Sequence, residues 1–123
     1  MHLQLGIIRT KIKKNQKMLK KNPKMLIVLT ETGRTARFLS RYRPEKPIVA
    51  ITDNKETRDK LLLSYGVLPY YLKYPKGKIH SLRAVFDFLR HRKILKVSDF
   101  VVVVRGKSWG EPGKSNTISV EQV

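Results

Sequence analysis

The sequence predicts an α/β domain in which helices cover both faces of a largely parallel sheet. Continuous apolar runs such as MLIVL (25–29) and DFVVVV (99–104) have the composition of strands covered on both faces. Amphipathic helical patterns separate these runs, which is the alternation typical of a parallel sheet. Since 123 residues is close to the usual size of one domain, we expect a single domain over residues 1–123.

The domain is expected to begin with a basic helical segment, residues 1–24, followed by a core, residues 25–123. Within residues 7–21 apolar side chains recur at helical spacing between lysines, and Pro23 marks the end of this pattern. The apolar positions are Ile8, Ile12 and Leu19.

The remaining elements alternate along the core. We expect strands at residues 25–29, 47–52, 67–74, 100–104 and 117–120. We expect helices at residues 34–43, 55–65 and 79–92. Pro69 interrupts the third strand and favours an edge position, because proline cannot donate to a ladder. Asp53 and Glu56 have the spacing of a capping box before the helix that begins near Lys55, and Gly66 is placed to end that helix as its C′ residue.

Charge is the most unusual bulk property of the chain. It has 27 Lys and Arg against 9 Asp and Glu, a formal net charge of +18, so it must attract polyanions or phosphorylated molecules. It has no cysteine, which excludes disulfides and thiolate metal sites and fits a cytoplasmic location. Because no apolar run approaches the length of a membrane span, we expect no membrane partner.

Two loops carry the polar residues of interest. The first follows the strand at 25–29 and contains hydroxyls, a glycine and a cation where a helix begins, a position that favours anions. Its candidate residues are Thr30, Thr32, Gly33, Arg34 and Thr35. They fit either a phosphate site or a simple helix cap formed by Thr32 or Thr35.

The second loop follows the strand at 100–104 and is rich in glycine and in side-chain donors. Its candidate residues are Gly106, Lys107, Trp109, Gly110, Gly113, Lys114, Ser115 and Asn116. The glycine spacing does not match a P-loop, so a plain connection remains an alternative. Trp109 fits either stacking on a sugar or base or sealing of the loop. If the two preceding strands are neighbours in the sheet, both loops face one crevice and can hold the two ends of a doubly charged ligand.

Two stretches together resemble the C-terminal domain of pyruvate kinases. They are LTETGRTARFLSRYRPEKPIVAITDNKETRDKLLLSYGVLPYYL and DFVVVVRGKSWGEPGKSNTISV, which contain the T-x-[ST]-G-[RK]-[ST]-A and G-x-P-G-x-[ST]-N-T patterns of that family in the same order. The resemblance implies a three-layer α/β/α sandwich whose five-stranded sheet has the order 3-2-1-4-5, with only the last strand antiparallel.

The resemblance also implies a regulatory role. Residues 30–35 match the loop that holds one phosphate of a sugar-phosphate effector, commonly fructose 1,6-bisphosphate, and residues 106–116 match the loop that closes over it. Many members differ at Lys107, Ser108 and Trp109, so we expect a phosphorylated metabolite, phosphate or sulfate rather than one named sugar. In complete enzymes this domain packs on a catalytic barrel and on a neighbouring subunit, and the chain is therefore expected to self-associate.

Catalysis and metal binding are not expected of this chain. Nothing in it resembles the family's barrel, and its carboxylates form no metal-binding cluster by spacing. His2 lies near the terminus, while His80 and His91 are too far apart on one helix to hold one ion. We expect no cofactor.

Two other functions remain open from the residues. Lysines and arginines are concentrated in two predicted helices, so one alternative is a basic nucleic-acid-binding protein on this fold. The sequence contains no motif that recognises RNA or DNA bases. The tyrosines fit core and edge positions better than a stacking platform; they are Tyr65, Tyr70, Tyr71 and Tyr74. The chain is also alternatively a partner-binding subunit of a larger kinase assembly.

Overall fold

The computed structural model describes residues 23–42, 44–73, 82–105 and 117–123. The strands are β1 (Leu26–Leu29), β2 (Ile48–Thr52), β3 (Val67–Tyr71), β4 (Phe100–Arg105) and β5 (Thr117–Gln122). The helices are α3 (Arg34–Arg41), α4 (Lys55–Leu61) and α5 (Leu82–His91). The sequence predicts a basic helix at 7–21 and a division of the chain at residue 24. Both predictions concern a segment that lies almost wholly outside the described residues.

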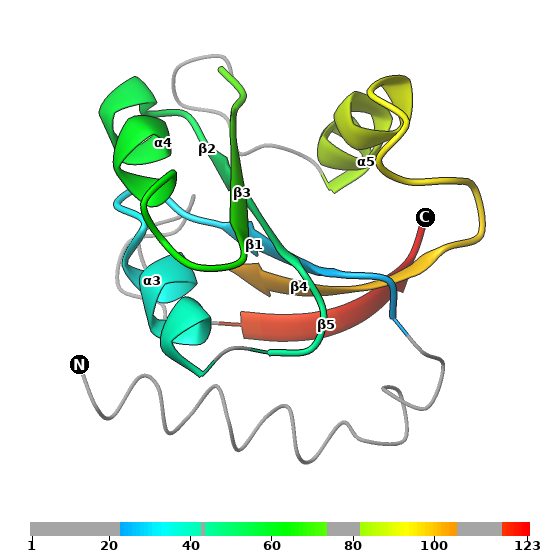
Figure 1. The fold of residues 1–123 in the computed structure, drawn as a ribbon. Helices are drawn as coiled ribbons and strands as arrows, with labels where there is room; N and C mark the ends of the chain where they lie inside the picture. The colour runs from blue at the N-terminus through cyan, green and yellow to red at the C-terminus, as the bar shows by residue number, and fades with distance from the viewer. Residues whose placement is uncertain (1–22, 43, 74–81, 106–116) are drawn as a thin grey trace.

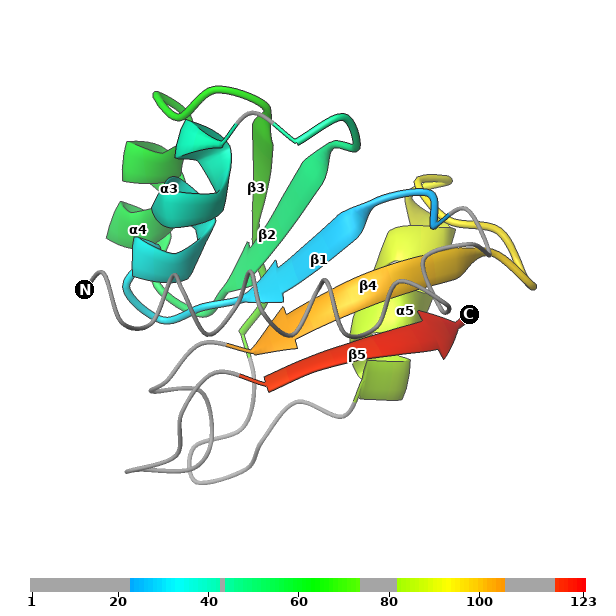
Figure 2. The same ribbon diagram turned by 90° about the horizontal axis from the view of Figure 1, so that it is seen from below.

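The five strands form one sheet in the order β3-β2-β1-β4-β5 (Figures 1 and 2). β1 pairs in parallel with both β2 and β4, and β2 pairs in parallel with β3. β5 runs antiparallel to β4, with Arg105 opposite Thr117. The strand order and the single antiparallel strand implied by the family resemblance are confirmed.

Burial explains which residues form the central strands. All five residues of β2 are buried, as are the last three of β1 and the middle four of β4. Such strands need apolar side chains on both faces, hence the unbroken runs in the sequence. β3 lies at the edge, and its Pro69 stands opposite Ala50 of β2. The predicted edge position of this strand is confirmed.

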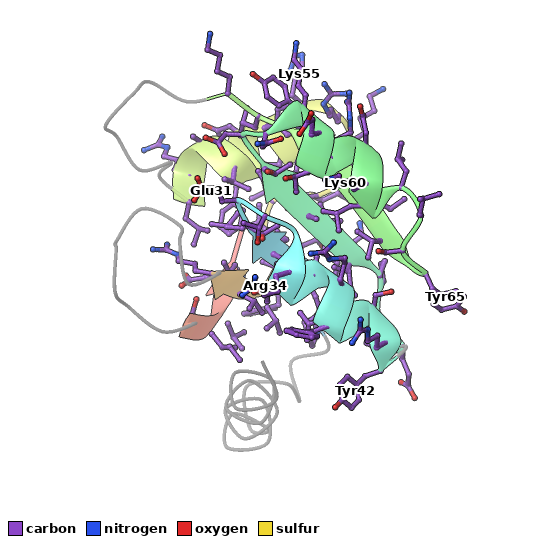
Figure 3. The ribbon with its side chains drawn as sticks, turned by 90° about the vertical axis from the view of Figure 1, so that its left-hand side faces the viewer. Glu31, Arg34, Tyr42, Lys55, Lys60 and Tyr65 are labelled. Atoms are coloured by element: carbon purple, nitrogen blue, oxygen red, sulfur yellow. The ribbon has the colours of Figure 1, made fainter. Side chains whose placement is uncertain are left out.

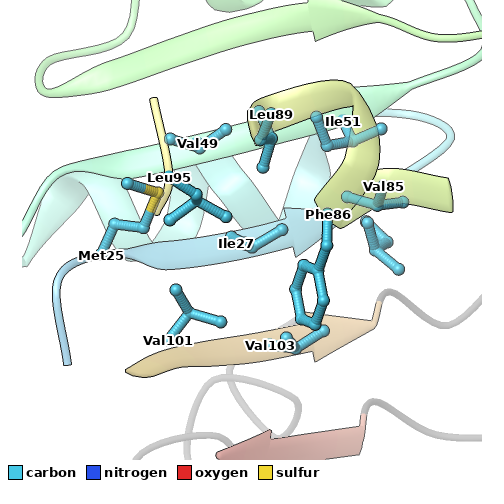
Figure 4. Packing of buried hydrophobic residues seen from close by; sticks show 11 residues of the cluster. Met25, Ile27, Val49, Ile51, Val85, Phe86, Leu89, Leu95, Val101 and Val103 are labelled. Atoms are coloured by element: carbon cyan, nitrogen blue, oxygen red, sulfur yellow. The ribbon is translucent and has the colours of Figure 1, made fainter. Parts of the chain in front are cut away.

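Helices cover both faces of the sheet, so the three-layer architecture is also confirmed. On one face α5 supplies Val85, Phe86 and Leu89 to a core with side chains from β1, β2 and β4 (Figure 4). On the other face α3 and α4 contribute Ala36, Leu39 and Leu61 to a second core. Figure 1 shows α3 and α4 together on one side of the sheet and α5 on the other.

The start of α4 differs from the predicted capping box. The N-cap is Asn54, whose Oδ1 accepts a hydrogen bond from the Thr57 N–H at 3.0 Å, and Asp53 precedes it. Glu56 instead lies in the first turn of the helix, where its charge suits the dipole. The sequence pattern was misleading because Asp53 and Asn54 are both good caps. The Asn54 N–H donates to the hydroxyl of Thr52, the last residue of β2, at 3.2 Å.

The end of α4 is also earlier than predicted. The helix ends at Leu61, and the N–H groups of Leu62, Leu63 and Ser64 donate to carbonyls three residues back. The chain tightens into 3₁₀-type turns there. Gly66 has a left-handed φ of +69°, but it follows these turns and is not the C′ residue of α4.

Smaller differences occur at other boundaries. α3 ends at Arg41 with Tyr42 as its C-cap, two residues before the predicted end. β3 ends at Tyr71, while β5 continues to Gln122, two residues beyond the predicted end. The first three residues predicted for the helix at 79–92 lie outside the described residues.

We expect Asn54→Ala to lower the free energy of unfolding by about 1 kcal/mol, because it removes the acceptor for the Thr57 N–H. Asp53→Ala is the matched control and should change stability much less. Urea denaturation followed by circular dichroism measures both. A larger loss with Asp53→Ala would contradict Asn54 as the cap.

Candidate functional site

The candidate site is the turn between β1 and α3, residues 30–33, together with the first turn of α3. The Thr30 N–H still belongs to the sheet and donates to the Ile51 carbonyl at 3.0 Å. The Thr30 hydroxyl accepts the Gly33 N–H at 2.9 Å and is buried, with 2% of the residue exposed. The buried Thr30 side chain therefore stabilises the turn through this hydrogen bond.

Two threonines from other elements hold the turn in place. The Glu31 carbonyl accepts the Thr57 hydroxyl of α4 at 2.9 Å and the Thr52 hydroxyl of β2 at 3.5 Å. The Glu31 side chain is exposed, so only its backbone is held. The sequence analysis did not assign these two threonines. Threonines at these positions could have been noticed, because both are buried and a buried hydroxyl requires a hydrogen-bond partner.

Gly33 is the N-cap of α3 and has a left-handed φ of +81°. A Cβ atom at this position would lie 3.1 Å from Leu61 Cδ2 and 3.1 Å from Thr57 Cγ2. Both the conformation and the close approach to α4 therefore require glycine. The expectation that Thr32 or Thr35 is the cap residue is wrong, because the cap is Gly33 and no side chain caps it.

The first turn of α3 offers backbone donors. The Arg34 N–H donates to the Thr32 hydroxyl at 3.3 Å, and the first helical hydrogen bond runs from Arg37 to Gly33. The N–H groups of Thr35 and Ala36 precede the first residue that can bond within the helix. Among the described residues neither has a hydrogen-bond acceptor.

The charges near this helix start are mostly positive. The first turn of α3 contains no acidic residue, and Arg34 is exposed at its beginning. Figure 3 shows Arg34 near Glu31, the one carboxylate of the turn. Thr32 is exposed, whereas Thr35 is 5% exposed. An anion arriving from solvent would therefore first meet the exposed side chains of Thr32 and Arg34, since Thr35 and Ala36 are buried.

The second predicted loop joins β4 to β5, and its candidate residues lie outside the described residues. They are Gly106, Lys107, Trp109, Gly110, Gly113, Lys114, Ser115 and Asn116. The strand ends that flank the loop are described. Leu29 stands opposite Arg105 in the parallel β1–β4 pair, and Arg105 stands opposite Thr117. Leu29, Arg105 and Thr117 therefore lie at the same end of the sheet, the end at which the turn at 30–33 begins. A crevice shared by the two loops requires this arrangement.

The part of the chain that the structure describes contains no group of three or more His, Asp or Glu side chains that could hold a metal ion. Within the same residues, no helix combines the length and apolar composition needed to cross a bilayer.

Comparison with known proteins gives the family. The family described as "Pyruvate kinase, alpha/beta domain" matches residues 14–121. The chain belongs to this family. Pyruvate kinase of Dictyostelium discoideum is 35% identical over 96 residues, which are 78% of this chain and 19% of that enzyme. Pyruvate kinase of Eimeria tenella is 31% identical over 99 residues, which are 80% of this chain and 19% of that enzyme.

A solved structure agrees with the family assignment. Cryptosporidium parvum pyruvate kinase in complex with ADP matches with a TM-score of 0.71 and 28% sequence identity. The match covers 97% of this chain and 23% of that one. The chain thus spans about a fifth of the length of its relatives, and what it matches is their α/β domain.

We expect Gly33→Ala to destabilise the fold more than Gly66→Ala. Both glycines have left-handed φ, so alanine costs about 1–2 kcal/mol of backbone strain at either position. Only at Gly33 would the new Cβ press on Thr57 and Leu61, whereas nothing lies within 4 Å at Gly66. Thermal unfolding of the two variants measures the difference. Equal losses would contradict a close contact between the turn and α4.

Proposed function

We propose that this chain is a regulatory domain that binds a phosphorylated metabolite at the carboxyl ends of β1 and β4. The observation that carries the proposal is the start of α3, which has no acidic side chain in its first turn and presents the exposed Thr32 and Arg34. Behind them lie the N–H groups of the buried Thr35 and Ala36, which lack an acceptor among the described residues. Such a helix start favours phosphate through its backbone donors and its dipole.

The residues that the sequence predicts for this site would have different roles in binding. Thr32 and Arg34 are exposed and would contact a phosphate directly. Thr30 and Gly33 would hold the turn, and Thr35 would contribute its N–H. The loop at 106–116 would supply the second set of donors, because β4, the strand before it, ends with Arg105 opposite Leu29.

The proposal assigns no catalysis to this chain. Its match is to the α/β domain of pyruvate kinase, and phosphoryl transfer requires a metal clamp and a positioned acceptor. A cytoplasmic location is part of the proposal, because a chain without cysteine has no need of an oxidising compartment.

We expect Arg34→Gln to weaken binding of fructose 1,6-bisphosphate about tenfold, because a charge-assisted hydrogen bond to phosphate is lost. Arg41→Gln removes the same charge at the other end of α3 and is the matched control. Isothermal titration calorimetry of the full chain measures both affinities, with inorganic phosphate as a second probe. Equal affinity of the two variants for either probe would remove the site assignment.

We also propose that the chain self-associates through apolar residues that follow α4. Leu62, Leu63 and Tyr65 are 64%, 92% and 65% exposed and adjoin one another in the turn after the helix. Exposed apolar side chains gathered in this way favour contact with a second copy. Figure 3 shows Tyr65 on the side of the molecule where α3 ends at Tyr42, away from Arg34.

We expect Leu63→Glu to shift the chain toward monomer in sedimentation velocity runs over a range of concentrations. The buried charge that this variant would place in the contact is unfavourable. Val97→Glu introduces the same charge at another exposed apolar residue, 69% exposed, and should leave the association unchanged. A strict monomer for the unsubstituted chain at high concentration would refute self-association.

A further inference from the structure

A groove at the β3 edge of the sheet lies apart from the site at the end of β1. It is a hollow of about 540 Å³ between α4, β3 and α5. Its lining combines aromatic and charged side chains: Arg58, Asp59, Leu62, Pro69, Tyr70, Tyr71, Phe88 and Arg92. Figure 1 shows α4 and α5 on opposite sides of β3, so the groove runs along the open edge of the sheet.

Arg92 is held over two aromatic rings in this groove. Its guanidinium carbon lies 4.5 Å from the centre of the Phe88 ring and 5.8 Å from the centre of the Tyr70 ring. The two rings meet edge to face, with centres 6.1 Å apart. A guanidinium on aromatic rings keeps its charge and needs no carboxylate. Because Arg92 remains exposed, its charge and its planar face are available to a ligand.

A second cation is placed in the same way. Lys55 Nζ lies 5.2 Å from the centre of the Tyr71 ring. In the described part of the chain neither Lys55 nor Arg92 belongs to an ion pair. Arg58 lines the groove too and is paired with Asp59 at 2.7 Å. The lining thus contains two cations, Arg58 and Arg92, and one carboxylate, Asp59, which is paired with Arg58. Lys55 adjoins the lining through its contact with Tyr71.

The groove continues past Phe88 and Arg92. A second hollow of about 640 Å³ lies along α5 and shares these two residues with the first. It is also lined by Ala84, Asp87 and His91. Asp87 is paired with Arg90, so the second hollow holds no unpaired carboxylate among the described residues. Two hollows separated by a guanidinium on aromatic rings can take up successive flat groups of one ligand.

We propose that this groove, which we call the edge groove, binds single-stranded nucleic acid without sequence preference. Bases would occupy the two hollows and stack on the Arg92 guanidinium and the neighbouring rings, and phosphates would contact Lys55 and Arg58. Aromatic and guanidinium faces combined with cations are the chemistry of sequence-tolerant single-strand binding. The net charge of +18 adds a general attraction for the backbone. This function is independent of the phosphate site at the end of β1.

The test must separate base stacking from simple charge attraction. We would measure fluorescence anisotropy of the full chain with a labelled oligouridylate and with an abasic strand of equal length. We expect the oligouridylate to bind about tenfold more tightly at equal salt, since only it has bases to stack. Equal affinities would overturn the proposal, because they would show attraction to the backbone alone.

A charge-preserving variant locates the site. Arg92→Lys keeps the positive charge but removes the planar guanidinium, so the preference for oligouridylate should fall to about twofold or less. Arg37→Lys makes the same change on α3, away from the edge groove, and should keep the full preference. A full preference in Arg92→Lys, with native thermal unfolding, would overturn the edge groove as the binding site.

A competition experiment keeps this proposal separate from the proposed function. Fructose 1,6-bisphosphate should not displace the oligouridylate at concentrations that saturate the first site. Displacement by the sugar phosphate would show that the strand occupies the end of β1 and would overturn the edge groove. Loss of sugar-phosphate binding alone would leave the nucleic-acid result unaffected.

Discussion

The placement of β1 between two parallel partners is the constraint on which the rest of this structure depends. Leu26–Leu29 pairs with β2 on one side and with β4 on the other, so both faces of the strand must be covered. Helices on each face meet that need. The same pairing makes β1 and β4 end side by side, and it thereby directs the turn at 30–33 and the loop after Arg105 to one end of the sheet.

The turn after β1 shows how packing prepares a polar site. Hydroxyls of Thr52 and Thr57 bind the Glu31 carbonyl, and Gly33 sits against α4 where no side chain would fit. These contacts fix the backbone before any ligand arrives. Because the donors at the start of α3 are then held in place, a bound anion would need to order little of the protein. This is the physical basis of pre-organised binding.

The strong positive charge of the chain acts differently at its two candidate sites. At the start of α3 the charge of Arg34 would supplement backbone donors that already suit a phosphate. At the edge groove, Arg92 and Lys55 are supported by aromatic rings, which hold cations without neutralising them. A family domain known as part of a longer enzyme can thus carry a second surface, because function resides in sites and not in the fold.

The residues alone were sufficient to predict the described strands and helices and the two-sided sheet, because apolar runs and helical periodicity are local patterns. The family resemblance added the strand order. Tertiary structure decided three further features: Asn54 as the cap of α4, the threonines that hold Glu31, and the placement of Arg92 over Tyr70 and Phe88. The cap of α4 is a local contact between Asn54 and Thr57, and Phe88 lies only four residues before Arg92. The contacts of Glu31 with Thr52 and Thr57, and that of Arg92 with Tyr70, join residues far apart in the chain. Such contacts leave no periodic trace in the sequence, since they arise only when separate elements pack together.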